Sequence, residues 1–183
     1  MMTKKTKGPS TNLIGRGGFF LMLGILFGCH DPTELPSCGE VIDLGDRGAF
    51  EEVDGGLVAH PAVDVLFYRC PAGQRYVNRS CRGEIQTLNF ADAQAYAEEV
   101  SARSSSRWRL PSPREMRAIQ EKSCVLPAYN PNIFPDLPVD NFWTNSTLEL
   151  SQYYGCVVYT FQGSRSCRAL LSAEHPFMLV REP

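Results

Sequence analysis

The amino-acid sequence predicts a disulfide-stabilised α+β fold. Two segments, residues 89–103 and 112–119, carry the capping and periodicity signals of helices. Several short segments alternate apolar and polar side chains between turn-forming residues, as strands do. Six of the seven cysteines lie beyond residue 29, and this even number indicates three disulfide bonds formed in an oxidising compartment.

The first 28 residues have the organisation of a bacterial secretory signal peptide. Four basic residues come first: Lys4, Lys5, Lys7 and Arg16. An apolar run from Phe19 to Phe27 follows, and no acidic residue occurs before Asp31. The run has about nine residues, far fewer than the roughly 20 that a transmembrane helix requires, which favours cleavage over permanent insertion.

The segment Leu26–Cys29 resembles a lipobox, in which a lipoprotein signal peptidase cleaves after a small residue and the next cysteine is lipidated. Gly28 is the small residue, so Cys29 is the expected lipid attachment site; an ordinary signal peptide with a coincidental cysteine is the alternative. Each buried methylene of an acyl chain contributes about 0.8 kcal/mol to membrane binding. His30 after the cysteine favours the outer over the inner membrane, with the domain in the periplasm or at the cell surface.

The mature chain is expected to consist of a lipidated tether, residues 29–37, and a single domain, residues 38–183. Removing 28 of 183 residues leaves 155, which suits one hydrophobic core. Cleavage leaves 14 basic against 20 acidic residues, a net charge of −6, and this disfavours a nucleic-acid partner. Four arginines are close in sequence: Arg69, Arg75, Arg79 and Arg82. Such a group can grip a carboxylate or sulfate, although solvated arginines on a loop and strand edge are the alternative.

The cysteine spacing favours one disulfide and leaves the others open. The six cysteines are Cys38, Cys70, Cys81, Cys124, Cys156 and Cys167. Cys70 and Cys81 are expected to pair because the segment between them contains turn-forming residues. A turn centred near Ser164 would keep Cys156 from facing Cys167, so Cys124 is expected to bond one of these two and Cys38 the other. No C-x-x-C pair occurs and the three histidines are scattered, so no zinc site is predicted.

The two helices have clear starting points. From Asn89, a competent N-cap, apolar residues recur at helical spacing as far as Arg103. The second helix begins at Ser112, where Pro113 occupies the first turn and Glu115 completes a capping box.

Strand patterns occur on both sides of these helices. Residues 48–70 are expected to form two strands around the turn Asp54–Gly56. Four further strands are expected near residues 142–148, 154–161, 167–172 and 177–181. The stretch before them, residues 125–141, contains four prolines and is expected to be a long loop, either ordered or disordered.

This loop and its continuation carry oxygen-bearing side chains that are candidate ligands for calcium. They are Asn130, Asn132, Asp136, Asp140, Asn141 and Asn145. Asparagine and aspartate are also ordinary turn formers, and the spacing matches no known calcium-binding loop.

Six motifs occur in the following order along the chain: FYRCPAGQ, C-x-G-E, FADAQAYA, WRLPSPREM, NPNIFPD and FWTNS. Together they resemble the Lcl C-terminal domain family over roughly Phe50 to Arg181. The most specific residues are Trp108, Arg109, Leu110, Pro111, Glu115, Phe142 and Trp143. These are expected to be mainly structural, because the tryptophans bury large surfaces and Arg109 can brace the sheet. The chain departs from the family's usual pattern at Ser106-Arg107 and at Thr144-Asn145.

The resemblance implies a fold related to C-type lectins and to formylglycine-generating enzymes, with two helices flanking small twisted sheets and long loops. It also implies binding to a surface polysaccharide, since the family's founding member is a collagen-like bacterial adhesin and such domains can bind sulfated polysaccharides. A subunit that docks another envelope protein is the second hypothesis. An enzyme is the third and least favoured hypothesis. The related oxidase chemistry needs reactive cysteines at matched positions, no cysteine of this chain can be matched to them, and no other catalytic motif is visible.

Overall fold

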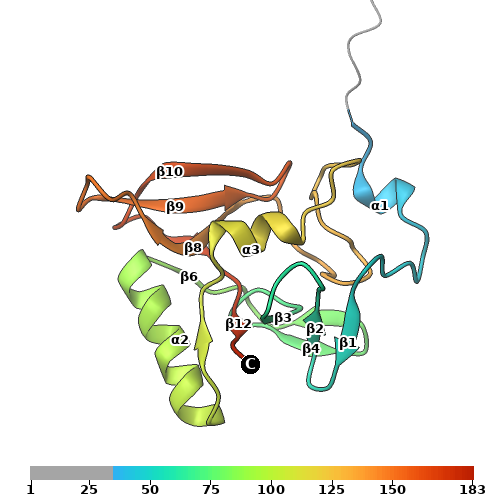
Figure 1. Cartoon of the computed structure of the whole chain (residues 1–183), viewed down its shortest axis with the longest axis horizontal. Helices are drawn as coiled ribbons and strands as arrows, with labels where there is room; N and C mark the ends of the chain where they lie inside the picture. The colour runs from blue at the N-terminus through green and yellow to red at the C-terminus, as the bar shows by residue number, and fades with distance from the viewer. Residues whose placement is uncertain (1–34) are drawn as a thin grey trace, which may run out of the picture. The chain divides into compact units, whose positions relative to one another are not determined.

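The structure, a computed structural model, describes residues 35–183 (Figure 1). The predicted signal peptide, the lipid site at Cys29 and most of the tether lie outside the described residues. The last tether residues already pair with the domain: the Pro36 carbonyl accepts from the Val125 amide at 2.9 Å, and Ser37 bridges Val125. Among residues 35–183, no helix has both the length and the apolar character needed to cross a membrane.

An antiparallel five-stranded sheet has the order β1-β2-β3-β12-β7. Its strands are β1 (Glu51–Val53), β2 (Leu57–Ala59), β3 (Leu66–Tyr68), β12 (Val180–Arg181) and β7 (Trp108–Arg109). The predicted turn joins β1 to β2 through Gly55 and Gly56, whose φ angles of 77° and 78° suit glycine. Val58, Phe67 and Val180 form one fully buried row across β2, β3 and β12. This face of the sheet therefore covers the core.

The segment at residues 48–70 forms three strands, not the two that were expected. The chain turns and bends at residues 61–65, between β2 and β3, so the alternating Val63, Val65 and Phe67 do not share one strand. Val65 and Phe67 are buried, and Val63 packs against the same core. The alternate spacing of these apolar residues therefore indicated which side chains face the core, but not where the strands begin and end.

Helix α2 (Phe90–Ser104) begins and ends close to the expected positions. The Asn89 side chain caps it by accepting from the Asp92 amide at 3.0 Å. The helix ends at Ser105, which has a left-handed φ of 54°. Its apolar residues Phe90, Ala93 and Ala97 are buried against β7, β8 and β6 (Thr87–Leu88).

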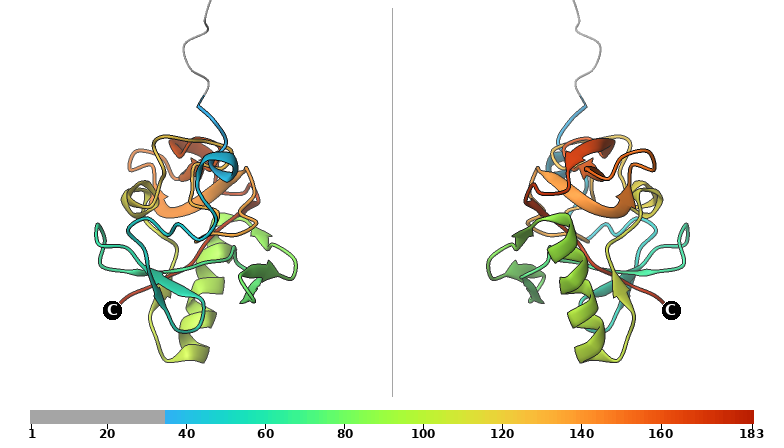
Figure 2. Two further views of the ribbon diagram at one scale, coloured as in Figure 1. Left: turned by 90° about the vertical axis from the view of Figure 1, so that its right-hand side faces the viewer. Right: turned by 90° about the vertical axis from the view of Figure 1, so that its left-hand side faces the viewer.

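A second sheet of three antiparallel strands has the order β10-β9-β8. Its strands are β8 (Asn141–Thr147), β9 (Tyr154–Tyr159) and β10 (Ser164–Leu170). Figures 1 and 2 show this sheet above α2 in every view. The contact runs through Trp143 of β8, whose ring meets the ring of Phe90 edge-on at 5.4 Å between centroids. The three predicted strands are thus present, with β10 starting three residues earlier than expected.

Helix α3 (Pro113–Ala118) has the predicted capping box, and its residues Met116 and Ile119 are buried. The proline-rich stretch that follows is an ordered irregular loop. Four of its side chains are buried in the core beneath the five-stranded sheet: Tyr129, Ile133, Phe134 and Leu137. Hydrophobic burial therefore orders a segment whose prolines exclude regular structure.

Several short elements have no clear signal in the sequence. They are α1 (Cys38–Val41), the pair β4 (Arg75–Val77) and β5 (Ser80–Arg82), β6, β7 and β11 (His175–Pro176), which pairs with β6. The last expected strand, residues 177–181, is shorter than expected: only Val180–Arg181 forms a strand, and Phe177 makes an isolated bridge to Trp143. Residues 35–183 as a whole form an α+β fold with small antiparallel sheets and three disulfides.

Cys70 bonds Cys81, which is the pair that the sequence favoured. The expectation for the other four cysteines is wrong: Cys38 bonds Cys124, and Cys156 bonds Cys167. The error lies in the position of the β9–β10 turn. Tyr159 pairs with Ser164, so the turn is centred between residues 161 and 162 and not near Ser164. That register brings Cys156 opposite Cys167.

Candidate functional site

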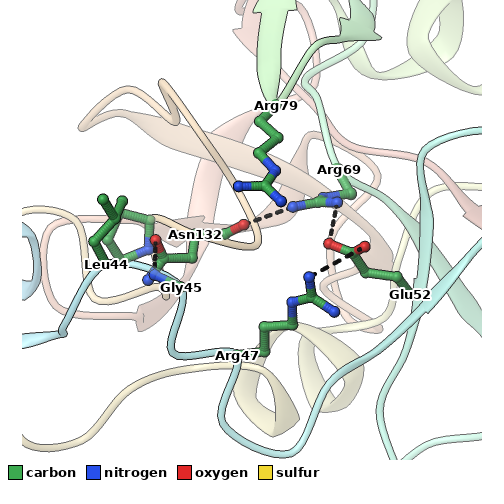
Figure 3. A pocket seen from close by; sticks show the side chains of 8 residues that line it. Leu44, Gly45, Arg47, Glu52, Arg69, Arg79 and Asn132 are labelled. Carbon is green, nitrogen blue, oxygen red and sulfur yellow. Dashed lines mark hydrogen bonds and ion pairs between the residues drawn. The ribbon is translucent and has the colours of Figure 1, made fainter.

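A cavity of about 200 Å³ opens beside the loop that joins α1 to β1 (Figure 3). Its eight lining residues come from five separate segments of the chain: Leu44, Gly45, Arg47, Glu52, Arg69, Arg79, Pro131 and Asn132. Three are arginines and one is a glutamate, so the lining carries two net positive charges. We call this cavity the arginine pocket.

Arg69 is a buried and fully engaged member of the arginine pocket. It follows β3, is 3% exposed, and donates from Nε to the Ile133 carbonyl at 2.8 Å and from Nη2 to the Asn132 carbonyl. Its Nη1 donates to the Glu52 carboxylate at 2.9 Å, and the Tyr76 ring lies 4.1 Å from its Cζ. A buried charge is costly unless it is paired and hydrogen-bonded, and Arg69 meets both conditions. Its charge contributes to the pocket, and each of its three nitrogens already donates one hydrogen bond within the protein.

Arg47 and Arg79 are the accessible cations of the arginine pocket. Arg47 is about half exposed, and its Nη2 lies 3.7 Å from Glu52, a loose ion pair of small energy. Arg79 is exposed and forms no ion pair with any other residue of 35–183. It occupies the β4–β5 turn with φ 63°, next to Asn78 with φ 50°, so the left-handed turn sets its direction.

The loop that carries Arg47 is held in place by two asparagines of the long loop. The Asn132 side chain donates to the carbonyls of Asp43 and Asp46 and accepts from the Gly45 amide at 3.0 Å. The Asn130 side chain donates to the same Asp46 carbonyl at 3.1 Å. These contacts span more than 80 residues of sequence, so only the folded chain brings Arg47 to Arg69.

Of the four arginines that are close together in the sequence, the structure places two at the arginine pocket and two away from it. Arg69 and Arg79 line the arginine pocket. Arg75 and Arg82 face each other across β4 and β5, are exposed, and do not line it. Arg47 was not expected at the site, because it lies in a loop with no motif and reaches the pocket only through tertiary contacts. Two of the four arginines therefore share a cavity with Arg47, and the anion binding expected of the group stays a prediction.

The six candidate calcium ligands do not gather at one point. Asn130 and Asn132 bind the loop at residues 43–46, as described above. Asp136 accepts from the Ser80 hydroxyl at 2.9 Å, and Asp140 accepts from the Asn141 amide at 2.6 Å. Asn145 is exposed on β8, where its side chain accepts from the Ser146 hydroxyl. Most of these oxygens already serve turns and loop contacts, which is the alternative that the sequence left open.

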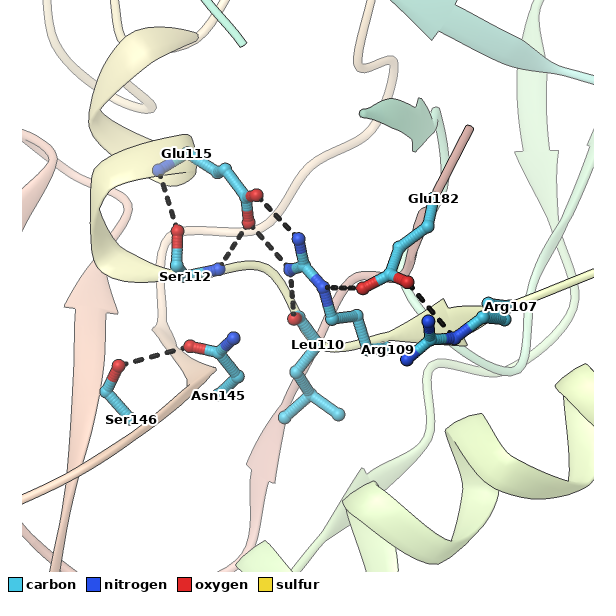
Figure 4. A network of polar contacts seen from close by, with 8 residues as sticks. All are labelled: Arg107, Arg109, Leu110, Ser112, Glu115, Asn145, Ser146 and Glu182. Carbon is cyan, nitrogen blue, oxygen red and sulfur yellow. Dashed lines mark hydrogen bonds and ion pairs between the residues drawn. The ribbon is translucent and has the colours of Figure 1, made fainter. Parts of the chain in front are cut away.

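Arg109 of the family motif stands at the centre of a polar network (Figure 4). Its Nη1 and Nη2 donate to the two oxygens of Glu115 at 2.8 and 2.7 Å, and its Nε donates to Glu182 at 2.9 Å. Glu182 also pairs with Arg107 at 3.1 Å. The hydrogen bonds that Arg109 donates to the Glu115 carboxylate are the largest cause that raises the pKa of Arg109, so this guanidinium stays charged at every accessible pH. The network joins β7, the start of α3 and the end of the chain.

Glu115 serves both this network and the cap of α3. Its carboxylate accepts from the Ser112 amide at 2.6 Å, while its own amide donates to the Ser112 hydroxyl at 3.2 Å. Burial, the largest single contribution, raises the pKa of Glu115. The hydrogen bonds from Arg109 and Ser112 together outweigh burial and hold that pKa below its ordinary value.

The apolar residues of the family motif lie in the core. Leu110, Phe142 and Trp143 are 2% exposed or less, and the Trp143 indole donates to the Leu88 carbonyl at 2.9 Å. Pro111 is buried, and its carbonyl accepts from the Asn145 amide at 2.9 Å. Trp108 is half-buried and donates to the Ser104 hydroxyl. These residues position β7, β8 and α3 and do not line the arginine pocket.

Within residues 35–183, no three side chains of histidine, cysteine, aspartate or glutamate are grouped so as to hold a metal ion. All six cysteines of that range are in disulfides. Burial lowers the pKa of His60 and of His175, in the latter case against the opposing charge of Asp140, which favours neutral imidazoles at neutral pH.

The fold and the arginine pocket define a small, disulfide-stabilised α+β module with a basic surface cavity. The sequence pattern of the Lcl C-terminal domain matches residues 57–181. This match covers well over half of the chain, and the protein therefore belongs to the Lcl C-terminal domain family. No curated protein matches the chain.

Proposed function

We propose that this protein is a lipid-anchored lipoprotein of the bacterial cell envelope, held by Cys29, most favourably at the outer membrane. Its domain, of C-type-lectin-like fold, binds an acidic surface polysaccharide through the arginine pocket. The observation that carries the proposal is the pair of accessible arginines, Arg47 and Arg79, above the buried charge of Arg69 in one cavity.

The arrangement suits a carboxylate or sulfate group on a sugar. Because Arg69 is buried and each of its nitrogens already donates within the protein, direct contacts come from Arg47 and Arg79. Arg79 has no acidic partner among residues 35–183, and Arg47 can leave its 3.7 Å pairing with Glu52 at little cost. A guanidinium presents a planar fork of donors that matches carboxylate and sulfate oxygens. Membership of the Lcl C-terminal family supports the same ligand class.

The test measures binding of the purified, oxidatively folded protein to heparin, to hyaluronate and to neutral dextran, each with calcium and with chelator. We expect heparin or hyaluronate to bind and dextran not to bind. Arg47→Ala and Arg79→Ala should each weaken binding about tenfold, the effect of one charged hydrogen bond. The matched control is Arg103→Ala, because Arg103 is an exposed arginine of α2, remote in sequence and paired with Glu99.

Equal weakening by all three variants would show general charge attraction and would contradict a site at the arginine pocket. A requirement for calcium would contradict direct recognition of the ligand by the arginines. The anchor is tested separately: Cys29→Ala should abolish incorporation of labelled palmitate and release the protein from the membrane fraction.

A docking role has one observation in its favour, an apolar patch at the β8–β9 connection. The patch consists of Leu148, Leu150, Tyr153, Tyr154 and Leu170, which are 37% to 97% exposed. Three of these residues are neighbours in the sheet, because the Leu148 amide donates to the Tyr154 carbonyl and Tyr154 pairs with Leu170. Contiguous exposed apolar side chains mark contact surfaces. A photo-crosslinker at position 150 should trap one envelope protein if this role holds, whereas the same probe at exposed Val77 should not.

A further inference from the structure

A second group of arginines lines a surface hollow of about 320 Å³ between α3 and β10. Its lining residues are Pro113, Arg114 and Arg117 from α3 and Arg165 from β10. Arg114 and Arg117 are three residues apart, which places them on one face of the helix. Met116 and Ile119, on another face, are buried in the core. The three guanidinium groups therefore come from two elements and share one hollow, which we call the α3–β10 hollow.

Within the described part of the chain, these three arginines have no negative counterpart. No acidic residue lines the α3–β10 hollow, and no ion pair within residues 35–183 includes Arg114, Arg117 or Arg165. The arginine pocket differs, since Glu52 offsets one of its charges. Like charges that line one hollow repel one another, so an anion bound there relieves that repulsion in addition to making hydrogen bonds.

The scaffold beneath the α3–β10 hollow is fixed at both ends of α3. At the start, Glu115 closes the capping box and binds Arg109. At the end, the Gln120 side chain donates to the Gln162 carbonyl of the β9–β10 turn at 2.6 Å. The Cys156–Cys167 disulfide then ties β10 to β9 two residues beyond Arg165. The backbone positions of all three arginines are thus set before any ligand arrives, which lowers the cost of binding.

We propose that the α3–β10 hollow is a binding site for a tetrahedral oxyanion, the phosphate or sulfate ester group of a ligand. A planar carboxylate is satisfied by one guanidinium fork. Three guanidinium groups arranged around a hollow instead match the several oxygens of a tetrahedral group. The site is distinct from the arginine pocket and does not depend on the polysaccharide function proposed for that pocket.

The experiment titrates the full protein with inorganic phosphate and inorganic sulfate, and it follows the arginine Nε–Hε and backbone amide signals by NMR. We expect saturable shifts concentrated on α3 and on β10 near Arg165. Arg117→Ala should weaken binding about tenfold, and Arg114→Ala/Arg117→Ala should abolish saturation at millimolar anion. These side chains are exposed, so the spectra of the variants should otherwise match the parent.

Two controls separate this site from other effects. Arg103→Ala, which removes the same charge from α2, should leave the titration unchanged. Arg47→Ala/Arg79→Ala should leave the shifts on α3 and β10 unchanged as well, whether or not the arginine pocket itself binds sulfate. The proposal is overturned if the shifts are linear and spread over all exposed arginines, or if Arg114→Ala/Arg117→Ala binds as the parent does.

Methyl phosphate and methyl sulfate, each tested at pH 5 and at pH 8, distinguish a site for phosphate esters from a site that also accepts sulfate esters. The second pKa of a phosphate monoester is about 6, so methyl phosphate changes from mostly −1 to mostly −2 across this range. Arginine stays charged throughout. Binding of methyl phosphate that strengthens several-fold at pH 8 identifies a phosphate monoester site, whereas equal binding of both esters at both pH values identifies a sulfate-tolerant site. Failure of both esters to bind overturns the proposal.

Discussion

At the scale of single residues, arginine takes two contrasting roles in this protein. Arg69 and Arg109 have their donors directed at carbonyls and carboxylates, and they join segments that are distant in sequence. Arg47 and Arg79 leave donors available to solvent or to a ligand. The difference follows burial: Arg69 is buried and Arg109 is partly buried, whereas Arg47 and Arg79 are exposed. A guanidinium withdrawn from water must satisfy its donors within the protein, while an exposed one is solvated.

The Arg109–Glu115 pair should contribute stability that depends on pH. The folded pKa of Glu115 lies below its ordinary value of 4.5, so its contribution is fully present above about pH 4.5 and is lost as the pH falls through the folded pKa. Glu115→Gln should lower the free energy of unfolding by about 1.5 to 3 kcal/mol at pH 7. Urea denaturation from pH 7 to pH 3 should show the difference between parent and variant shrinking below pH 4.5.

The matched control for that series is Glu99→Gln, because Glu99 pairs with Arg103 at an exposed position of α2. Its effect should be within about 0.5 kcal/mol at every pH. A difference between parent and Glu115→Gln that stays constant down to pH 3 would contradict the depressed pKa of Glu115.

At the scale of elements, local signals predicted the helices better than the strands. Capping depends on residues within one turn, and both Asn89 and Ser112 cap helices in the expected way. The strands β4 to β7 have only two or three residues each, too few for alternation to be recognised. The β9–β10 turn was misplaced by two to three residues, since several of its residues are competent turn formers.

Gly163 in that turn should be intolerant of a side chain. It has a φ of 69°, and an added Cβ would lie 2.1 Å from Cδ of Gln120. Gly163→Ala should therefore cost about 1 to 2 kcal/mol in backbone strain and also displace the Gln120 side chain from the Gln162 carbonyl. Thermal unfolding of Gly163→Ala, Gln120→Ala and the double variant separates the two effects. The double variant should be more stable than the sum of the single effects predicts, and strict additivity would contradict the contact.

At the scale of the whole molecule, the two ends of the described chain are tied into its middle. Strand β12, close to the C-terminus, lies between β3 and β7 in the large sheet. Near the other end, the Cys38–Cys124 disulfide closes a loop with a sequence separation of 86, whereas the other two disulfides each span 11. A longer closed loop restricts the unfolded chain more strongly.

Removing the long-range disulfide should accordingly cost the most stability. By loop entropy, Cys38→Ala/Cys124→Ala should lower the free energy of unfolding by about 4 to 5 kcal/mol, and Cys70→Ala/Cys81→Ala by about 3 kcal/mol. Guanidinium denaturation of the two double variants gives the comparison. The reverse order would show that local packing around Cys70–Cys81, and not chain entropy, dominates.

Sequence patterns alone were enough to predict the family, the α+β class, the two capped helices and the Cys70–Cys81 pair. The helices and the disulfide follow from turn and cap chemistry within about a dozen residues, whereas the family and the fold class follow from the order of motifs and elements along the chain. The tertiary structure alone decided the pairing of Cys38 with Cys124 and of Cys156 with Cys167, the union of Arg47 with Arg69 and Arg79, and the convergence of Arg114, Arg117 and Arg165. The reason is physical: strand register and the packing of distant loops bring together residues that no local signal connects.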